Sequence, residues 1–172
     1  IGLLAHQVMH NEAEKSWHLL LTHKDLNLIP EEEFQPWLER MCDQYFVPML
    51  KAKSVEEAFL CLNQFRILAA TRQGSMSVEG LNEQVERILS RRLSQIRLAQ
   101  NYHGKPVMVT KNHHGLGLFN GDIGILWAQD NGQLNVCFMH SQGVYKVNVG
   151  LLQDLETVYA MTIHKTQGSE FQ

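Results

Sequence analysis

Two tight-turn sequences, Asp130-Asn-Gly132 and Ser141-Gln-Gly143, most strongly limit how this chain can fold. Each ends in a glycine, which readily adopts the positive φ angles of short hairpin turns. They lie among short β-type runs at residues 106–110, 123–129, 134–139 and 144–149. Because successive strands joined by tight turns pair antiparallel, the sequence predicts a small antiparallel β-barrel here instead of a parallel sheet.

A second pattern precedes these strands and belongs to a different fold class. Residues 65–71 form a short apolar run typical of a buried strand, and Arg72-Gln-Gly74 turns away from its end. Apolar residues then recur at helical spacing and predict a long helix: Leu81, Val85, Ile88, Leu89, Leu93 and Ile96. Strand, glycine-bearing loop and helix in this order indicate an α/β sheet, in which ligands bind at the carboxyl ends of the strands.

The α/β pattern returns at residues 156–161, so the predicted barrel interrupts it as an insertion. Before residue 64 the apolar positions are spaced as in helices, and Ser54 and Glu57 have the spacing of a capping box. We therefore expect an α/β chain with three parts: a helical lead-in at 1–63, a domain formed by 64–100 together with 154–172, and an inserted barrel at 101–153.

Composition indicates the setting of the protein. At 172 residues and 44% hydrophobic, the chain can bury a sizeable core. Its cysteines, Cys42, Cys61 and Cys137, are far apart and form no Cys-x-x-Cys pair, so a reduced, cytoplasmic setting fits best. No apolar run reaches the roughly 18 residues of a membrane span. Because the chain has no initiating Met and both ends look cut, we expect it to be a piece of a larger protein.

The charge distribution is uneven although the net charge is only −3. Between Arg87 and Gly121 there is no Asp or Glu, whereas six Lys or Arg side chains and three histidines lie in that stretch. Such a stretch is a candidate binding surface for phosphates. A solvated helix face followed by a loop explains the same pattern equally well.

Neither a metal site nor a catalytic triad is predicted. Although the chain has nine histidines, His113 and His114 are adjacent, so their side chains diverge, and no histidine pair has zinc-ligand spacing with a third ligand. The sequence also contains no Gly-x-x-x-x-Gly-Lys-Ser/Thr loop and no defensible Ser-His-Asp or paired-carboxylate arrangement.

The closing run, residues 161–172, combines groups that suit a nucleic-acid backbone and a nucleotide. Thr162, His164 and Lys165 can donate to phosphate oxygens without reading a base sequence. Gly168 lets the backbone approach a ligand closely, and Glu170 offers the acceptor pair that binds a ribose hydroxyl. The alternative is a polar surface turn after a core strand.

This closing run resembles the fifth helicase motif of superfamily-one enzymes, in the form shared by RecD-type, relaxase and Pif-like helicases. The motif has the pattern Ala-x-Thr-x-His-Lys-x-Gln-Gly-x-Glu. The matching residues are Ala160, Thr162, His164, Lys165, Gln167, Gly168 and Glu170.

Two further segments carry the same resemblance. Residues 68–74 and 78–82 are similar to the fourth motif of RecD-type helicases, with Ser77 in place of a second glycine. By this resemblance Arg72 is the candidate catalytic residue, since a guanidinium beyond a core strand can reach the γ-phosphate of a nucleotide. Residues 116–124 resemble an Asn-Gly-x-x-Gly element at the mouth of the inserted barrel, which makes Asn120 a candidate DNA contact.

The resemblance implies a partial second RecA-like domain carrying an SH3-like barrel, within an ATP- and Mg²⁺-dependent 5′-to-3′ DNA helicase. Such a subunit works beside RecB and RecC in exodeoxyribonuclease V, which acts in recombinational repair of double-strand breaks. The residues that contact nucleotide would be Arg72, Gln167, Gly168 and Glu170, and those that hold a single DNA strand would be Thr162, His164, Lys165 and Asn120.

By itself the chain is expected to be inactive, because it lacks the phosphate-binding loop and its lysine. Two alternatives stay open. One is a module that binds nucleic acid or protein and has no enzymatic activity. The other is the helicase part of a relaxase or of a Pif-like helicase.

Overall fold

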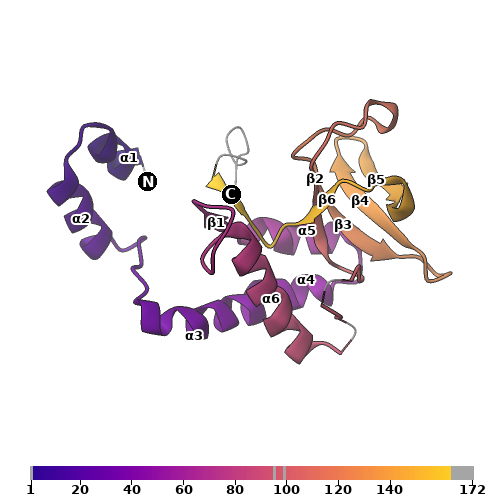
Figure 1. Cartoon of the computed structure of the whole chain (residues 1–172), viewed down its shortest axis with the longest axis horizontal. Helices are drawn as coiled ribbons and strands as arrows, with labels where there is room; N and C mark the ends of the chain where they lie inside the picture. The colour runs from indigo at the N-terminus through magenta and orange to yellow at the C-terminus, as the bar shows by residue number, and fades with distance from the viewer. Residues whose placement is uncertain (1, 95, 99, 164–172) are drawn as a thin grey trace. The chain divides into compact units, whose positions relative to one another are not determined.

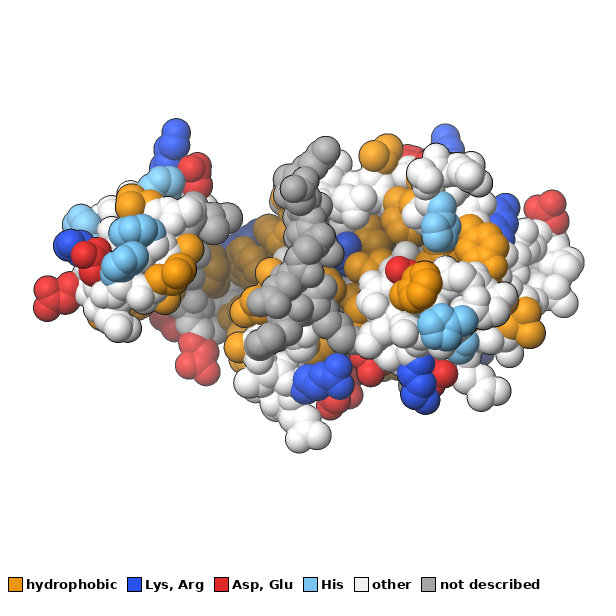
Figure 2. Space-filling model, turned by 90° about the horizontal axis from the view of Figure 1, so that it is seen from above, with side chains coloured by type: hydrophobic (Ala, Val, Ile, Leu, Met, Phe, Trp, Pro, Cys, Tyr) orange, Lys and Arg blue, Asp and Glu red, His pale blue; other side chains and the backbone are white. Residues whose placement is uncertain are grey.

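The computed structural model describes residues 2–94, 96–98 and 100–163 of the chain. Its backbone contacts divide the chain into two compact units, residues 1–38 and residues 39–172. In the first unit α1 (Gly2–Met9) and α2 (Ala13–Thr22) contact each other. Large apolar side chains of this unit stay exposed, among them Leu3, Val8, Met9, Trp17 and Leu21, and Figure 2 shows apolar and histidine side chains on its surface.

The second unit begins within a long helical segment. Helix α3 (Glu31–Met41) continues through a π-helical turn (Cys42–Phe46) into α4 (Val47–Leu50), and α5 (Val55–Gln64) follows. Buried side chains of these elements form a helical core: Cys42, Phe46, Met49, Leu50, Ala58, Phe59 and Leu62. The predicted helix start at Ser54 is confirmed, because the Ser54 hydroxyl accepts a hydrogen bond from the Glu57 amide at 3.2 Å. The Glu57 carboxylate accepts from the amide of Lys53 and not from that of Ser54 as the capping box predicted.

The predicted strand–loop–helix unit is present. Strand β1 (Ile67–Ala69) pairs in parallel with β7 (Ala160–Thr162), so that Ala69 lies level with Thr162. Helix α6 (Val78–Arg92) packs against β7. Its buried apolar residues, Leu81, Val85, Ile88 and Leu89, lie on one face, as their helical spacing predicts. In Figure 1 α6 lies beside the β1–β7 pair.

Five strands form a second, antiparallel sheet: β2 (Pro106–Val109), β3 (Ile123–Ala128), β4 (Leu134–His140), β5 (Gly143–Asn148) and β6 (Leu155–Thr157). The strand order is β5-β4-β3-β2-β6. One face buries a cluster of Val107, Val109, Leu118, Leu126, Val136, Phe138, Val147 and Leu152. Side chains alternate along a strand, so Ile125 and Cys137 belong to the opposite face, and α5 contacts β3 and β4. The chain therefore buries both faces of this sheet.

The expected closed barrel is not found among the described strands. The antiparallel meander and both hairpin turns occur where the sequence predicts them, but β5 and β6 are the two edges of the sheet and do not pair with each other. Turn sequences specify which neighbouring strands pair, whereas closure depends on how far the sheet twists and staggers. Neither the twist nor the stagger of a sheet has a local sequence signal.

The antiparallel sheet and the α/β pair share a continuous stretch of chain. Strand β6 leads through Val158 and Tyr159 directly into β7, and the Val158 amide donates to the Pro106 carbonyl at 3.1 Å. Met108 of β2, Val158 and Met161 form a small buried cluster at this point. Tyr159 is fully buried and makes an edge-on contact with the ring of Phe46, 4.9 Å between centroids.

The loop between β1 and α6 folds back over the first turn of the helix. Ser77 is completely buried, donates to the Gly74 carbonyl at 2.6 Å and accepts from the Gly80 amide at 3.2 Å. Ser77 stands where the resembled motif has glycine, and its hydroxyl both caps α6 and ties down the loop. A Cβ added at Gly80 would overlap the carbonyl oxygens of Gly74 and Ser75, so this close approach requires glycine.

We expect Gly80→Ala to lower the free energy of unfolding by about 1–3 kcal/mol, because the new methyl group would have to displace the backbone of the loop. Urea unfolding of the purified protein measures this change. Gly115→Ala is the matched control, since a Cβ at Gly115 meets nothing within 4 Å. Equal stability of the Gly80→Ala variant and the control would contradict the close packing of the loop on α6.

Candidate functional site

The carboxyl edge of the β1–β7 pair brings two of the predicted site residues together. Thr162 ends β7, and Arg72 follows the level residue Ala69 of β1 by three positions. Both line one pocket of about 270 Å³, whose other walls are α6, Met108 and the β6–β7 segment. Parallel pairing has this effect because the carboxyl ends of neighbouring parallel strands lie at the same edge of a sheet.

Backbone hydrogen bonds to α6 hold the loop that carries Arg72. The Val78 amide donates to the Thr71 carbonyl at 3.0 Å, and the Glu79 amide donates to the Arg72 carbonyl at 3.5 Å. Gly74 has φ of 111°, which a residue with a Cβ rarely adopts. The Arg72 residue is exposed. Its main chain is thus fixed beside the pocket while its side chain faces solvent.

Asn82, to which the sequence analysis assigned no role, holds β7 in place. Its side-chain amide donates to the Ala160 carbonyl at 3.0 Å and to the Val78 carbonyl at 2.9 Å, and its oxygen accepts from the Ala160 amide at 2.9 Å. The amide therefore acts as a strand neighbour for β7. A buried asparagine on the apolar face of a helix was the available signal, because such a group must find hydrogen-bond partners.

The described wall of the pocket is rich in carboxylates. Four glutamates line it, Glu79, Glu83 and Glu86 from α6 and Glu156 from β6, and Arg72 is the one Lys or Arg among the lining residues that the structure describes. Glu86 is paired with Lys105. Phosphate groups at this pocket would need further positive charge, either from a divalent cation or from basic side chains outside the wall.

Glu86 is part of a buried polar network with Lys105, Tyr102 and Tyr159, and all four side chains are less than a tenth exposed. The Lys105 ammonium lies 2.8 Å from Glu86 Oε1, and the Tyr102 hydroxyl donates to the same oxygen at 2.9 Å. The hydroxyls of Tyr102 and Tyr159 are 2.9 Å apart. Burial is the main cause that raises the pKa of both tyrosines above the usual range, so both hydroxyls keep their protons.

Several predicted site residues lie outside the residues that the structure describes. These are His164, Lys165, Gln167, Gly168 and Glu170. Of the closing motif, residues 160–163 are described, and Ala160, Met161 and Thr162 line the pocket. The assignments to strand phosphates and to a nucleotide ribose therefore stay predictions from the sequence.

Asn120 does not line the pocket of Arg72 and Thr162. It is exposed in the segment between β2 and β3, where its backbone amide donates to the side-chain oxygen of Asn112 at 2.9 Å. Gly121 beside it has φ of 101°, and Phe119 is about half exposed. A Cβ at Gly124 would overlap Val136, so this glycine permits close strand packing.

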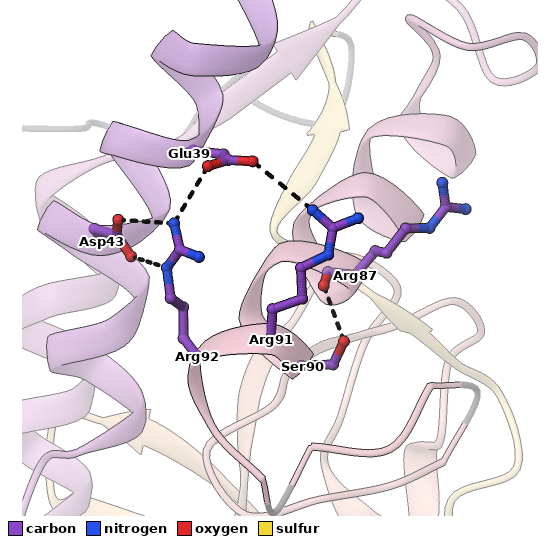
Figure 3. Close-up of polar contacts among 6 residues, drawn as sticks. All are labelled: Glu39, Asp43, Arg87, Ser90, Arg91 and Arg92. Atoms are coloured by element: carbon purple, nitrogen blue, oxygen red, sulfur yellow. Dashed lines mark hydrogen bonds and ion pairs between the residues drawn. The ribbon is translucent and has the colours of Figure 1, made fainter.

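Most cations of the acid-free stretch are paired with carboxylates from elsewhere in the chain. Arg92 makes two hydrogen bonds to Asp43, at 2.9 and 3.2 Å, and one to Glu39 at 3.3 Å, while Arg91 lies 3.9 Å from Glu39 (Figure 3). Lys105 pairs with Glu86, and Lys111 lies 2.7 Å from Asp154. Figure 3 shows the Arg87 side chain directed away from Glu39 and Asp43.

These ion pairs change the interpretation of the stretch. Cations that share carboxylates at the surface offer less attraction to phosphates than the linear sequence suggests. The solvated, ion-paired helix face therefore explains Arg91 and Arg92 better than a phosphate-binding surface does.

No group of three or more His, Cys, Asp or Glu side chains in the described part of the chain could hold a metal ion. Within the same residues, no helix is long and apolar enough to cross a membrane.

Asn82→Leu is expected to lower the free energy of unfolding by about 2–4 kcal/mol, because the amide and carbonyl of Ala160 would lose their partner inside the protein. Gln84→Leu on the same helix is the control, because the Gln84 side-chain amide donates to the Ser75 carbonyl at the exposed surface. That change should cost less than about 1 kcal/mol. Equal losses for both variants, measured by urea unfolding, would contradict the role of Asn82.

Comparison with known proteins agrees with the resemblance in the sequence. The RecD subunit of the RecBCD enzyme of Mycobacterium tuberculosis (strain CDC 1551) is 30% identical over 174 residues, which cover 99% of this chain and 30% of that subunit. The RecD subunit of Mycolicibacterium smegmatis is 40% identical over 114 residues, 66% of this chain and 20% of the relative. An ATP-dependent RecD2 DNA helicase of Deinococcus radiodurans is 28% identical over 108 residues, 62% of this chain and 15% of the relative.

No family model matches the chain. Among solved structures, a Bacteroides Pif1 bound to single-stranded DNA covers 84% of this chain and 42% of its own length, with 17% identity and a TM-score of 0.37. A TM-score this low supports no statement on function. The curated relatives align with between 62% and 99% of the chain, and the chain spans between about a seventh and a third of their length. On these alignments the chain belongs to the RecD family.

Proposed function

We propose that this chain is the coupling part of an ATP-dependent DNA helicase subunit that acts in a RecBCD-type exodeoxyribonuclease V. The observation that carries the proposal is the parallel pairing of β1 with β7, which places the Arg72 loop and the start of the closing motif at one sheet edge. Two segments that are far apart in the sequence thus share one pocket. A pocket built from both motifs suits a site that must respond to the nucleotide and to the DNA strand together.

In this proposal residues 64–100 and 154–172 belong to a second RecA-like motor domain, and residues 101–153 form the SH3-like insertion. Support comes from the parallel pair with its covering helix α6, and from the antiparallel sheet, of which β2 to β5 lie between the two chain segments and β6 lies in the second. ATP and Mg²⁺ would be held between this domain and the first motor domain. The 172 residues alone would not hydrolyse ATP, because their sequence contains no phosphate-binding loop.

The described residues fit one side of a bound nucleotide. Arg72 supplies a guanidinium that can donate to a terminal phosphate, where it would stabilise charge that develops during phosphoryl transfer. The glutamates Glu79 and Glu83 in the same pocket suit basic partners or a hydrated cation better than the phosphates themselves. Arg72 therefore works here together with positive charge that other parts of the enzyme supply.

The proposed contacts with a single DNA strand come mainly from the closing motif. Thr162, His164 and Lys165 would hold phosphates of a single DNA strand, whereas Gln167, Gly168 and Glu170 would face the nucleotide. Asn120 on the inserted sheet would make a further strand contact. Closure of the cleft on ATP would then move this grip relative to the first motor domain, which is translocation in the 5′-to-3′ direction. RecB and RecC would be the neighbouring subunits.

In the full-length protein, Arg72→Ala is expected to lower DNA-stimulated ATP turnover by at least about 10³-fold, the loss typical of a removed arginine finger. Affinity for single-stranded DNA should stay within about twofold of the parent, because Arg72 contacts the nucleotide and not the strand. Arg87→Ala, which removes an exposed arginine of α6 outside the pocket, is the control and should keep full turnover. Turnover near the parental rate in Arg72→Ala would refute the role of Arg72.

Lys165→Ala tests the strand grip in the same full-length protein. Losing one phosphate contact should weaken single-strand binding and reduce the slope of log K against log salt by about 0.7. Lys111→Ala, which removes a lysine already paired with Asp154, should leave both quantities nearly unchanged. Fluorescence anisotropy at several salt concentrations measures both. An unaltered slope in the Lys165→Ala variant would show that this lysine does not contact phosphate.

A further inference from the structure

The buried network of Glu86, Lys105, Tyr102 and Tyr159 joins three parts of the fold. Glu86 belongs to α6, and Tyr159 lies in the connection between β6 and β7. Tyr102 and Lys105 precede β2 and are attached to the antiparallel sheet: Gly104 donates to the Leu126 carbonyl at 2.6 Å, and the Leu126 amide donates to the Lys105 carbonyl at 2.9 Å. A movement of β3 therefore carries Lys105 with it.

The direction of the hydrogen bonds in this network is fixed. Each tyrosine hydroxyl has one proton, and Tyr102 donates its proton to the Glu86 carboxylate. Tyr159 must then donate to Tyr102, so the order is Tyr159 to Tyr102 to Glu86. The ammonium of Lys105 binds the same carboxylate oxygen and also donates to the Gln100 carbonyl at 3.3 Å. Every member depends on the position of Glu86.

Apolar contacts alone would not set the orientation of the sheet against α6. The cluster of Met108, Val158 and Met161 holds the two parts together, but apolar packing has no directional preference. A buried ion pair adds little net stability compared with apolar residues of similar size, whereas separating its partners leaves a charge buried without compensation. Any position of the sheet that separates Lys105 from Glu86 is therefore energetically unfavourable.

Glu86 also lines the pocket of Arg72, together with Glu79, Asn82 and Glu83 of the same helix. One carboxylate is therefore part of the wall of the pocket and, at the same time, the anchor of the antiparallel sheet. A single DNA strand that binds the antiparallel sheet and displaces it would act on this carboxylate through Lys105 and Tyr102.

We propose that Glu86, Lys105 and Tyr102 are positioning residues that fix the inserted sheet against α6 and carry the effect of strand binding on the sheet to the Arg72 pocket. The inference rests on the proposed function, because it names the route between its two ligands. It predicts that the network can be loosened without loss of the pocket. Strand-dependent turnover would then fall while turnover without DNA persists.

The experiment uses Tyr102→Phe in the full-length protein, which removes one buried hydroxyl and keeps the ring. Expected is a loss of at least about fivefold in the stimulation of ATP turnover by single-stranded DNA, the lower end of typical coupling between sites. The KM for ATP and the turnover without DNA should stay near parental values. Tyr159→Phe, which removes the donor to Tyr102, should give the same loss, and the double variant no further loss, because both act through one network.

Arg92→Met is the matched control, since it breaks surface ion pairs of the same helix with Asp43 and Glu39 and leaves the network intact. It should keep full stimulation by DNA. Undiminished stimulation in both tyrosine variants would overturn the inference. So would an equal decrease of turnover with and without DNA, because a role in folding alone would reduce both.

A distance measurement tests whether the network fixes the sheet against α6, and it requires no enzymatic activity. Spin labels are placed through Arg87→Cys on α6 and Asn131→Cys in the β3–β4 turn, in a Cys61→Ser background. Cys42 and Cys137 are buried, and burial raises the pKa of the Cys42 thiol to about 12, so neither should take up label. The distance distribution should be narrow in the parent and broader with Tyr102→Phe. Equal widths would overturn the inference.

The two tests separate the failure of this inference from that of the proposed function. A full-length protein with no DNA-stimulated ATP turnover would refute the proposed function, while the spin-label widths would still decide whether the network fixes the sheet. Normal turnover together with equal widths would refute the network's role alone.

Discussion

The parallel pairing of β1 with β7 is the contact on which the rest of this structure depends. It joins residues 67–69 to residues 160–162, and the whole antiparallel sheet lies between them in the chain. Two short strands offer few hydrogen bonds, so the pair needs support from its surroundings. Asn82 supplies that support by bonding both backbone groups of Ala160 from α6. The Asn82 side chain thus holds β7 in place at the sheet edge that carries the candidate site.

Helix α6 serves three purposes at once because its faces differ. Its apolar face packs into the core, its buried polar residues Asn82 and Glu86 organise β7 and the antiparallel sheet, and its acidic residues Glu79 and Glu83 line the pocket. The described wall of the pocket is rich in glutamate, although the proposed ligand carries phosphates. This mismatch is reasonable for one wall of a site completed by another domain, where opposite charges meet.

Local patterns in the sequence predicted the elements well. The strand at 65–71, the helix with its stripe from Leu81, and the hairpin turns are all present, because each depends on spacing or on turn residues close in the chain. Closure of the barrel is not found among the described strands, and it could not be predicted locally because it depends on twist and stagger over five strands. Of the two interpretations of the acid-free stretch, the ion-paired helix face is favoured for Arg91 and Arg92, whose partners Glu39 and Asp43 lie about fifty residues earlier.

By itself, the sequence determined the family and the order of the elements, because motifs and turn signals are contiguous. It also singled out Arg72 and Thr162, whose shared pocket depends on strand pairing across the insertion. Only the tertiary structure decided that Ser77 caps α6 in place of a glycine, that Asn82 holds β7, and that Glu86 faces both the pocket and Lys105. The physical reason is distance: these groups satisfy one another across folds of the chain, where hydrogen bonds and buried charges require partners that no local pattern specifies.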